Sequence, residues 1–465
     1  MLECFLPLIG YIIVLVAATL LAILLPGTPG VLVPIGIFLL IATLALVRGA
    51  ASSRLGTRKT LCVLFFSLAA VHVLCGFLSA FLSVWHTSIR SNPEVYFANA
   101  FVIDSVGLLA AALGYSWRLN TTEANSHGRL SLLIDADLAE HFFRFFLVAG
   151  AVLMFAVYWR LGVQDYLAVP AQWPFMRYIT SRNMGGSATD EWFANRAMDL
   201  LTVALPFLAY RFAKRPRALN LFFIIVGYLA LLLPLRRANL LAVIFGAVIL
   251  IGIGRHDVYR LTRRWILIGA CLFILSQCLF LAATLLSEPT AEGVLTVSST
   301  GLPEVRDLAW TLNLLQGERL NGMTFVQGLV PLPSILSEWS VRHGLRAIST
   351  RLIGADKDGE SGGLRLTLMG EGFINLGYPG AIAVSFLWGC AVAWCERLLR
   401  STEKCSSEFM NYVAVMCFVW LFFPVYLAGT EAAATVKSAA ILLFFIAWAC
   451  KYRPRLAPVP QGASS

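Results

Sequence analysis

Apolar blocks of about 20 residues recur along the chain, and this feature constrains the fold more than any other. About 20 apolar residues are what an α-helix needs to cross a bilayer. Only 13% of the residues are charged, whereas soluble domains carry about 25%. The chain is therefore predicted to be all-α, a single polytopic membrane domain over residues 1–465 with about twelve transmembrane helices. The blocks lie near 4–25, 30–47, 60–84, 100–116, 141–159, 196–212, 219–234, 238–254, 265–286, 373–394, 409–428 and 432–450.

The net charge of +10 is distributed in a way that argues against nucleic-acid binding. If the N-terminus lies inside, every basic cluster falls on the same side of the membrane, which is the positive-inside pattern. Both chain ends are then predicted to be cytoplasmic, and segments 161–195 and 287–372 to be periplasmic loops. The clusters lie at 48–59, 211–217, 255–264, 397–404 and 451–455.

Cysteine and acidic patterns predict neither disulfides nor a metal. The ten cysteines fall in apolar blocks or on the predicted cytoplasmic side, and none of them pairs in a zinc-type cluster. Asp356-Lys357-Asp358-Gly359-Glu360-Ser361 contains the Asp-x-Asp of nucleotide-sugar glycosyltransferases, but it is predicted to face away from soluble nucleotide donors. Its glycine also comes too early for a calcium loop. We expect no metal and no cofactor.

Segment 161–195 combines aromatic and basic side chains, among them Trp173 and Arg177 in Gln172-Trp173-Pro174-Phe175-Met176-Arg177-Tyr178. Such a mixture is typical of the aromatic belt at a membrane interface. It also fits a sugar platform, because an aromatic face stacks on a pyranose while arginine binds phosphate. Both interpretations stay open at this stage.

Two ionisable features stand in unusual places. Arg236 and Arg237 occupy a short turn that is predicted to lie outside, against the positive-inside trend. They are either counter-ions for lipid headgroups or a fixed anion site, because guanidinium groups bind phosphate oxygens bidentately. His72 falls inside an apolar block, where it is either functional or a neutral imidazole hydrogen-bonded to a neighbouring helix.

The loop 287–372 is the largest polar part of the chain. Segments 306–316 and 334–350 have amphipathic helical periodicity, and the first includes Trp310. His343 is one of two histidines predicted to lie outside, and it forms an i, i+4 pair with Trp339. Arginines outnumber lysines in the loop, which favours phosphate or carboxylate recognition. The loop cations are Arg306, Arg319, Arg342, Arg346, Arg351, Arg365 and Lys357.

Four stretches, taken in order, resemble the Wzy-type O-antigen polymerase family. Arg236 and Arg237 open a span, and Arg306 heads a loop helix. Asn321-Gly322-Met323-Thr324-Phe325, followed by Pro331, is similar to the family's Gly-x-Thr-(aromatic)…Pro turn. Met369-Gly370-Glu371-Gly372-Phe373-Ile374-Asn375-Leu376-Gly377-Tyr378-Pro379-Gly380 resembles its Glu-x-(aromatic)-x-Asn-x-Gly-x-x-Gly. O-antigen ligases share much of this layout and usually rely on a loop histidine.

The resemblance implies a glycosyltransferase at the periplasmic face of the bacterial inner membrane. A glycan on undecaprenyl diphosphate passes to a sugar hydroxyl of a lipid-linked repeat unit, with inversion. Membrane lipids and a chain-length-regulating co-polymerase are the other expected partners. The implied roles are diphosphate binding by Arg236, Arg237 and Arg306, catalysis by Glu371, His343 and Arg365, and sugar binding by Asn375, Trp173, Trp310 and Arg177.

Other interpretations remain. A ligase would use the same donor once, and a non-enzymatic transporter of lipid-linked oligosaccharide would show two similar halves with broken helices, whereas the sequence has no internal repeat. Glu371 is the proposed base, or it is the ion-pair partner of Arg365 or Lys437. Asn375 orients sugar, or it forms an interhelical hydrogen bond.

Overall fold

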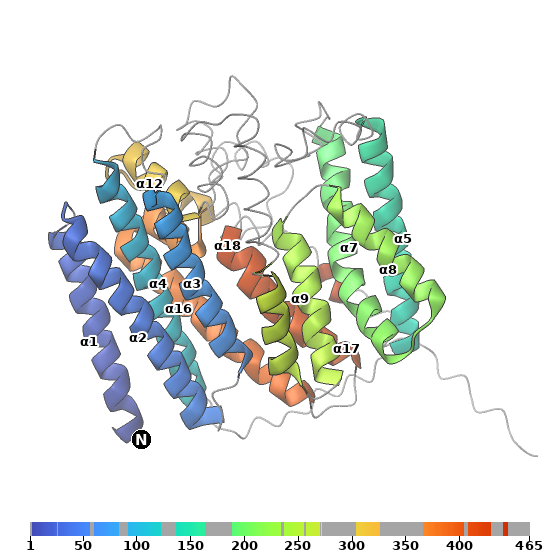
Figure 1. Cartoon of the computed structure of the whole chain (residues 1–465), viewed down its shortest axis with the longest axis horizontal. Coiled ribbons are helices and arrows are strands. Elements are labelled where there is room, and N and C mark those ends of the chain that lie inside the picture. Colours follow the sequence, from blue (N-terminus) through green and yellow to red (C-terminus); the bar gives the residue numbers. More distant parts are fainter. Residues whose placement is uncertain are drawn as a thin grey trace, which may run out of the picture.

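The computed structural model describes residues 2–25, 27–55, 60–82, 92–121, 136–162, 188–233, 237–254, 257–269, 271, 304–325, 366–403, 408–428 and 440–444. Within these residues the chain is all-α, as predicted. Figure 1 shows the helices side by side, with the N-terminus at the lower end of α1. In chain order they are α1 (Leu2–Leu24), α2 (Pro29–Leu55), α3 (Leu61–Leu82), α4 (Pro93–Thr121), α5 (Ala136–Arg160), α7 (Ala188–Lys214), α8 (Ala218–Leu232), α9 (Arg237–Gly254), α12 (Glu304–Leu315), α16 (Leu368–Glu403), α17 (Glu408–Trp420), the π-helix η4 (Leu421–Val425) and α18 (Tyr426–Ala428).

Several helices have the length and composition of membrane spans. Large apolar side chains are exposed on them, such as Phe145 and Leu387, each 66% accessible, which fits contact with hydrocarbon rather than with water. The chain thus has the features of a multi-pass membrane protein, and the count of twelve spans stays a prediction. Five described helices are long and apolar enough to span a membrane: Pro29–Leu55, Leu61–Leu78, Pro93–Thr121, Asp137–Arg160 and Leu368–Arg400.

Helix α4 is the central element of one group of helices, since it packs against α1, α2, α3, α12 and α16. Small residues bring its backbone directly against α16. A Cβ added at Gly114 would lie 2.0 Å from the backbone oxygen of Phe386. One added at Gly389 would lie 1.9 Å from the backbone oxygen of Ala111. Close small-residue crossings of this kind are typical of helix pairs in membranes.

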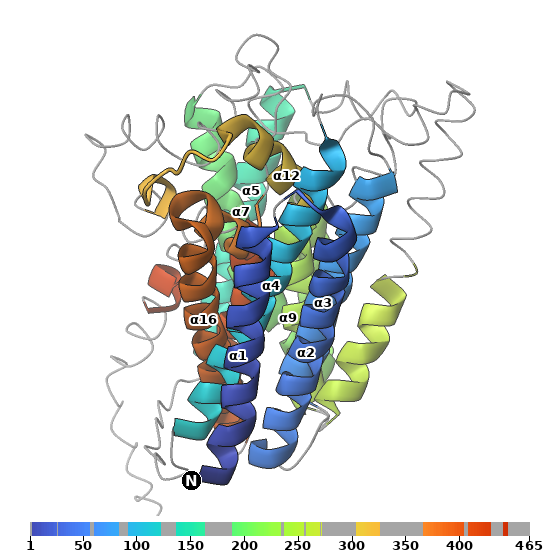
Figure 2. The ribbon, with the colours of Figure 1, turned by 90° about the vertical axis from the view of Figure 1, so that its left-hand side faces the viewer.

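Helix α16 reverses direction at Gly377, whose φ is 68° and ψ is −155°. Gly372 and Gly380 would lie about 12 Å apart along a straight helix, yet a Cβ added at Gly380 would lie 2.3 Å from the Gly372 oxygen. Residues 368–376 therefore form a short helix folded back on 378–403, and Figure 2 shows this turn at the top of α16. We call this unit the α16 hairpin.

The hairpin lies where the large loop is predicted to end, at residue 372, and where a span is predicted to begin, near 373. The helix begins at Leu368, and Leu366 and Met369 are fully buried. Leu366, Leu368 and Met369 are apolar, and their side chains gain more by burial against neighbouring helices than by exposure to water. The loop boundary itself stays a prediction.

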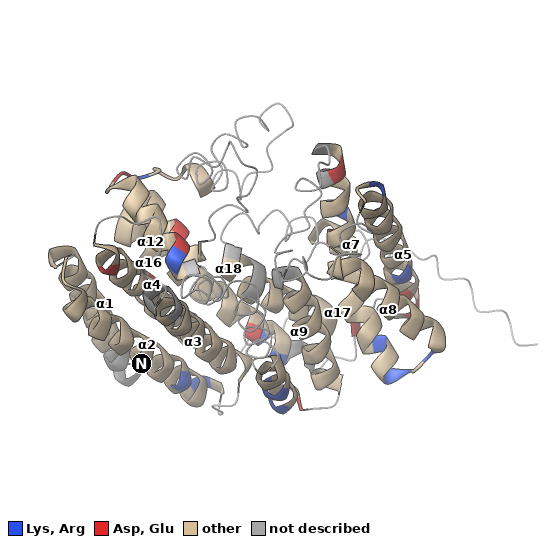
Figure 3. Ribbon diagram, turned by 45° about the horizontal axis from the view of Figure 1, so that its top comes forward, with Lys and Arg blue, Asp and Glu red and all other residues tan. Residues whose placement is uncertain are grey.

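Figure 3 shows Lys and Arg near the lower ends of α2 and α8, and further charged residues on α12 and at the upper ends of α5 and α7. Arg211 of α7 is buried at the lower end and forms ion pairs with Asp137, Glu140 and Glu408. These contacts join α5, α7 and α17. The same end holds Arg397 of α16, which donates to the Leu119 oxygen at 2.5 Å.

Candidate functional site

Glu371 lies in the first turn of the α16 hairpin and is fully buried. Its Oε1 accepts a hydrogen bond from Thr324 Oγ1 at 2.7 Å. One turn later, Asn375 Nδ2 donates to Thr324 Oγ1 at 2.7 Å and to the Glu371 backbone oxygen at 2.8 Å. The Thr324 hydroxyl thus donates to one partner and accepts from the other, which fixes its orientation. We call these three residues the Glu371 cluster.

A tight turn over residues 320–325 brings Thr324 to the cluster. The backbone N–H groups of Leu320 and Asn321 donate to the oxygens of Ile374 and Asn375 at 3.0 and 3.1 Å. Asn321 and Gly322 have φ values of 49° and 83°, in the left-handed region that asparagine and glycine tolerate best. The Asn-Gly pair therefore lets this turn dock on the hairpin.

A second buried acid, Asp104 of α4, contacts the start of the hairpin. Thr367 Oγ1 donates to Asp104 Oδ1 at 2.6 Å and accepts the backbone N–H of Gly370 at 3.0 Å. Thr367 is therefore the N-cap of the short helix. The N–H of Glu371 donates to the Thr367 oxygen at 2.9 Å, so Thr367 connects Asp104 to the backbone of Glu371.

Helix α12 lies beside the same hairpin, and it is the amphipathic helix expected near 306–316. Leu308 packs 3.2 Å from a Cβ added at Gly370. Arg306 donates to Asp307 Oδ1 from Nε at 3.1 Å and from Nη2 at 2.9 Å, and its guanidinium lies 5.0 Å from the Trp310 ring centre. A diphosphate bound by Arg306 would therefore compete with Asp307 for this cation.

Arg319 lies next to the reversal of the hairpin. Its guanidinium lies 4.4 Å from the ring centre of Phe373, and that ring meets Tyr378 edge to face. Desolvation lowers the pKa of Arg319 from its ordinary value, and Tyr378 opposes this shift. Among the described residues no carboxylate forms an ion pair with Arg319, so it is a cation open to an anionic partner.

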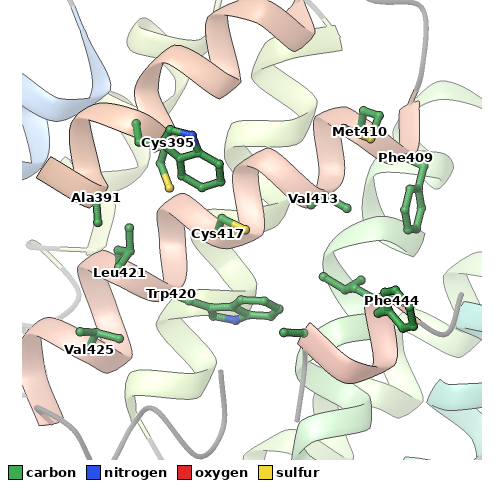
Figure 4. A pocket seen from close by; sticks show the side chains of 13 residues that line it. Ala391, Cys395, Phe409, Met410, Val413, Cys417, Trp420, Leu421, Val425 and Phe444 are labelled. Carbon is green, nitrogen blue, oxygen red and sulfur yellow. The ribbon is translucent and has the colours of Figure 1, made fainter. Parts of the chain in front are cut away.

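An apolar cavity of about 500 Å³ lies between α16, α17 and residues 440–444 (Figure 4). Trp394, Cys395, Val413, Cys417 and Trp420 are among its lining residues, and no charged side chain belongs to that lining. Sugar hydroxyls and a diphosphate have no ionic partner there. The cavity is therefore suited to hydrocarbon.

His72 contacts a neighbouring element, as one of its two interpretations expects. Its Nδ1 lies 3.4 Å from the hydroxyl of Tyr426 in α18, and the two rings meet edge to face at 5.8 Å. The predicted contact of His72 with a neighbouring helix is therefore confirmed, and Tyr426 is the contacting residue.

The predicted site residues divide into those the structure describes and those it does not. Glu371 and Asn375 lie in one cluster, and Arg306 and Trp310 lie together on α12. Arg237 opens α9, although its side chain lies outside the described residues. The predicted roles of the remaining residues stay predictions, because these residues also lie outside that part: Arg236, Trp173, Arg177, His343 and Arg365.

Two residues of the site were not expected from the sequence. Asp104 carried an available signal, because an acid inside an apolar block is a functional candidate by default. Thr367 carried no such signal in the sequence, because its partner Asp104 is 263 residues away in the chain. Only the packing of α4 on the hairpin brings the pair together.

No known protein family, characterised protein or solved structure matches this chain. In the Glu371 cluster, one carboxylate oxygen accepts a hydrogen bond from Thr324, and the amide of Asn375 lies beside it. Arg306 and Arg319 lie on the two segments that pack against the hairpin.

Proposed function

We propose that the chain is a lipid-linked oligosaccharide polymerase, a glycosyltransferase of the bacterial inner membrane. The observation that carries this proposal is the contact of Thr324 with Glu371 and Asn375. These residues come from the turn 321–325 and the stretch 369–380, the two stretches whose resemblance to Wzy-type polymerases is most detailed. Residues that lie 47 apart in the chain thus meet in one cluster, as parts of one site should.

The proposed reaction is a single displacement at the anomeric carbon of the donor. The acceptor hydroxyl gives its proton to Glu371, its oxygen forms the new glycosidic bond, and undecaprenyl diphosphate leaves with the electron pair of the broken C–O bond. General-base catalysis of this kind contributes about 10²–10⁴-fold. Arg236, Arg237, Arg306 and Arg365 are the proposed cations for the departing diphosphate, and His343 is the second candidate base.

Access to Glu371 requires movement, because the side chain is fully buried. A substrate hydroxyl reaches the carboxylate only when a covering segment is displaced. The turn 320–325 is the described segment that contacts the carboxylate directly. Displacing Thr324 by a sugar hydroxyl would exchange one hydrogen-bond donor for another at Oε1, which keeps the buried acid satisfied throughout.

The distribution of charge supports a periplasmic site. Arg211 and Arg397 lie at the lower ends of α7 and α16, whereas α12 lies at the upper end in Figure 1. By the positive-inside rule the lower end faces the cytoplasm. In the proposed orientation, with about twelve spans and both termini inside, the Glu371 cluster faces the periplasm.

The test compares polymer and precursor in cells that depend on this chain for the polysaccharide. Glu371→Gln, Arg236→Ala and Arg365→Ala are each expected to abolish polymer, while the protein and the lipid-linked single units still accumulate. Arg215→Ala is the matched control, since Arg215 is exposed at the opposite end. Accumulation of the lipid-linked unit on the cytoplasmic face would instead identify a transporter.

A further inference from the structure

Asp104 is the only charged residue of α4 between Glu94 and Arg118, and it is 1% exposed. An acid in such a place is costly, and in membrane helices it is retained for function. One of its contacts is the hydrogen bond from Thr367, the residue that caps the hairpin.

The contacts of Thr367 transmit the position of α4 to Glu371. Its hydroxyl is used twice, as a donor to Asp104 and as an acceptor from Gly370. Its backbone oxygen accepts the N–H of Glu371 at 2.9 Å. Thr324 and Asn375 hold Glu371 from the other side. The base is thus fixed between the turn 320–325 and the acid of α4.

We propose that Asp104 is a positioning residue that acts through Thr367 to place Glu371 for proton abstraction. This assignment rests on the proposed function. Asp104 itself stays away from the reacting atoms, and its role is to accept the Thr367 hydroxyl. A hydroxyl at 367 and an oxygen acceptor at 104 are therefore required, whereas the negative charge of Asp104 is not.

The experiment uses the full chain in vesicles with undecaprenyl-diphosphate-linked oligosaccharide extracted from cells that make the polymer. Thr367→Val is expected to lower kcat by at least about tenfold at unchanged KM, because a small misplacement of a catalytic group is costly. Thr367→Ser is expected to stay within about twofold of the wild type. Asp104→Leu and Asp104→Asn form a second pair with the same expected contrast. Ser105→Ala is the control, since Ser105 is also buried but bonds only its own helix, at the Phe101 oxygen.

Several results would overturn the assignment. The assignment is wrong if Thr367→Val works at the wild-type rate. It is also wrong if both members of a pair lose the same activity, or if the loss is confined to KM. If Thr367→Val fails to fold, the Asp104 pair decides the question by the same criteria. A wild-type protein that forms no product overturns the proposed function itself, which separates the two failures.

Discussion

At Glu371 a buried carboxylate is kept in the protein interior by specific donors. Thr324 supplies a hydroxyl to Oε1, and Asn375 holds that hydroxyl from the other side. Asn375 Oδ1 has no hydrogen-bond partner among the described residues. The nitrogen of Asn375 bonds its own helix and the turn 320–325, while its oxygen can accept from a donor such as a sugar hydroxyl. Both interpretations of Asn375 stay predictions.

Thr324→Val tests the importance of the donor to Glu371. Valine keeps the shape of threonine and leaves the carboxylate without that hydrogen bond, which costs about 1–3 kcal/mol for a buried acceptor. We expect a lower midpoint of thermal unfolding in detergent and a loss of polymer, whereas Thr324→Ser keeps both. Equal behaviour of the valine and serine variants would contradict the proposed role of the hydroxyl.

Two residues of this site, Glu371 and Asn375, were predicted from the sequence, whereas Asp104 and Thr367 were not. Glu371 and Asn375 were named from the stretch that resembles the polymerase family, and the structure has them one helical turn apart. Asp104 and Thr367 are joined only by tertiary packing, which local periodicity does not encode. The sequence indicates two partners of Arg306, because Asp307 is its neighbour in the chain and Trp310 is one helical turn away.

Among the helices, the crossing of α4 and α16 determines where the cluster lies. Its tightness comes from small residues, because any side chain at Gly114 or Gly389 would enter the backbone of the partner helix. The sequence predicted two spans here and did not predict their contact. It also missed the reversal at Gly377, whose φ and ψ lie in a region that only glycine adopts readily.

Gly389→Ala tests this crossing. The added methyl group would lie 1.9 Å from the Ala111 oxygen, so the helices must separate, and overpacking of this kind costs about 1–3 kcal/mol. Gly49→Ala in α2 is the control, because nothing lies within 4 Å of its added Cβ and alanine favours a helix by about 1 kcal/mol. Unfolding midpoints in detergent should move in opposite directions; a stable Gly389→Ala protein would contradict the close crossing.

Taken as a whole, the molecule has a basic lower end that is held together by buried ion pairs. Arg211 contacts Asp137, Glu140 and Glu408, and Lys214 reaches Glu408 at 2.9 Å. The positive-inside pattern predicted the gathering of basic residues but not their acidic partners. Those partners come from α5 and α17, far apart in the chain, and they join both helices to α7.

Arg211→Met tests whether these ion pairs hold the lower end together. Removing the buried guanidinium leaves Glu140 paired with Arg144 and Glu408 paired with Lys214, so the cost is expected not to exceed the about 3–5 kcal/mol of a buried charge left without any partner. We expect a large fall in the unfolding midpoint. Arg215→Ala removes an exposed arginine 3.9 Å from Asp137 and is expected to change stability by less than about 1 kcal/mol. Equal effects of the two substitutions would show that burial of Arg211 is unimportant.

The central claim is that Glu371 catalyses repeated glycan transfer between lipid-linked units. The most direct measurement is reconstitution of the purified chain with a lipid-linked repeat unit, followed by separation of the products by length on a gel. The wild-type protein is predicted to give a ladder, and Glu371→Gln to give the single unit alone at unchanged protein stability. A single addition by the wild type would indicate a ligase, and a full ladder from Glu371→Gln would contradict the role of Glu371.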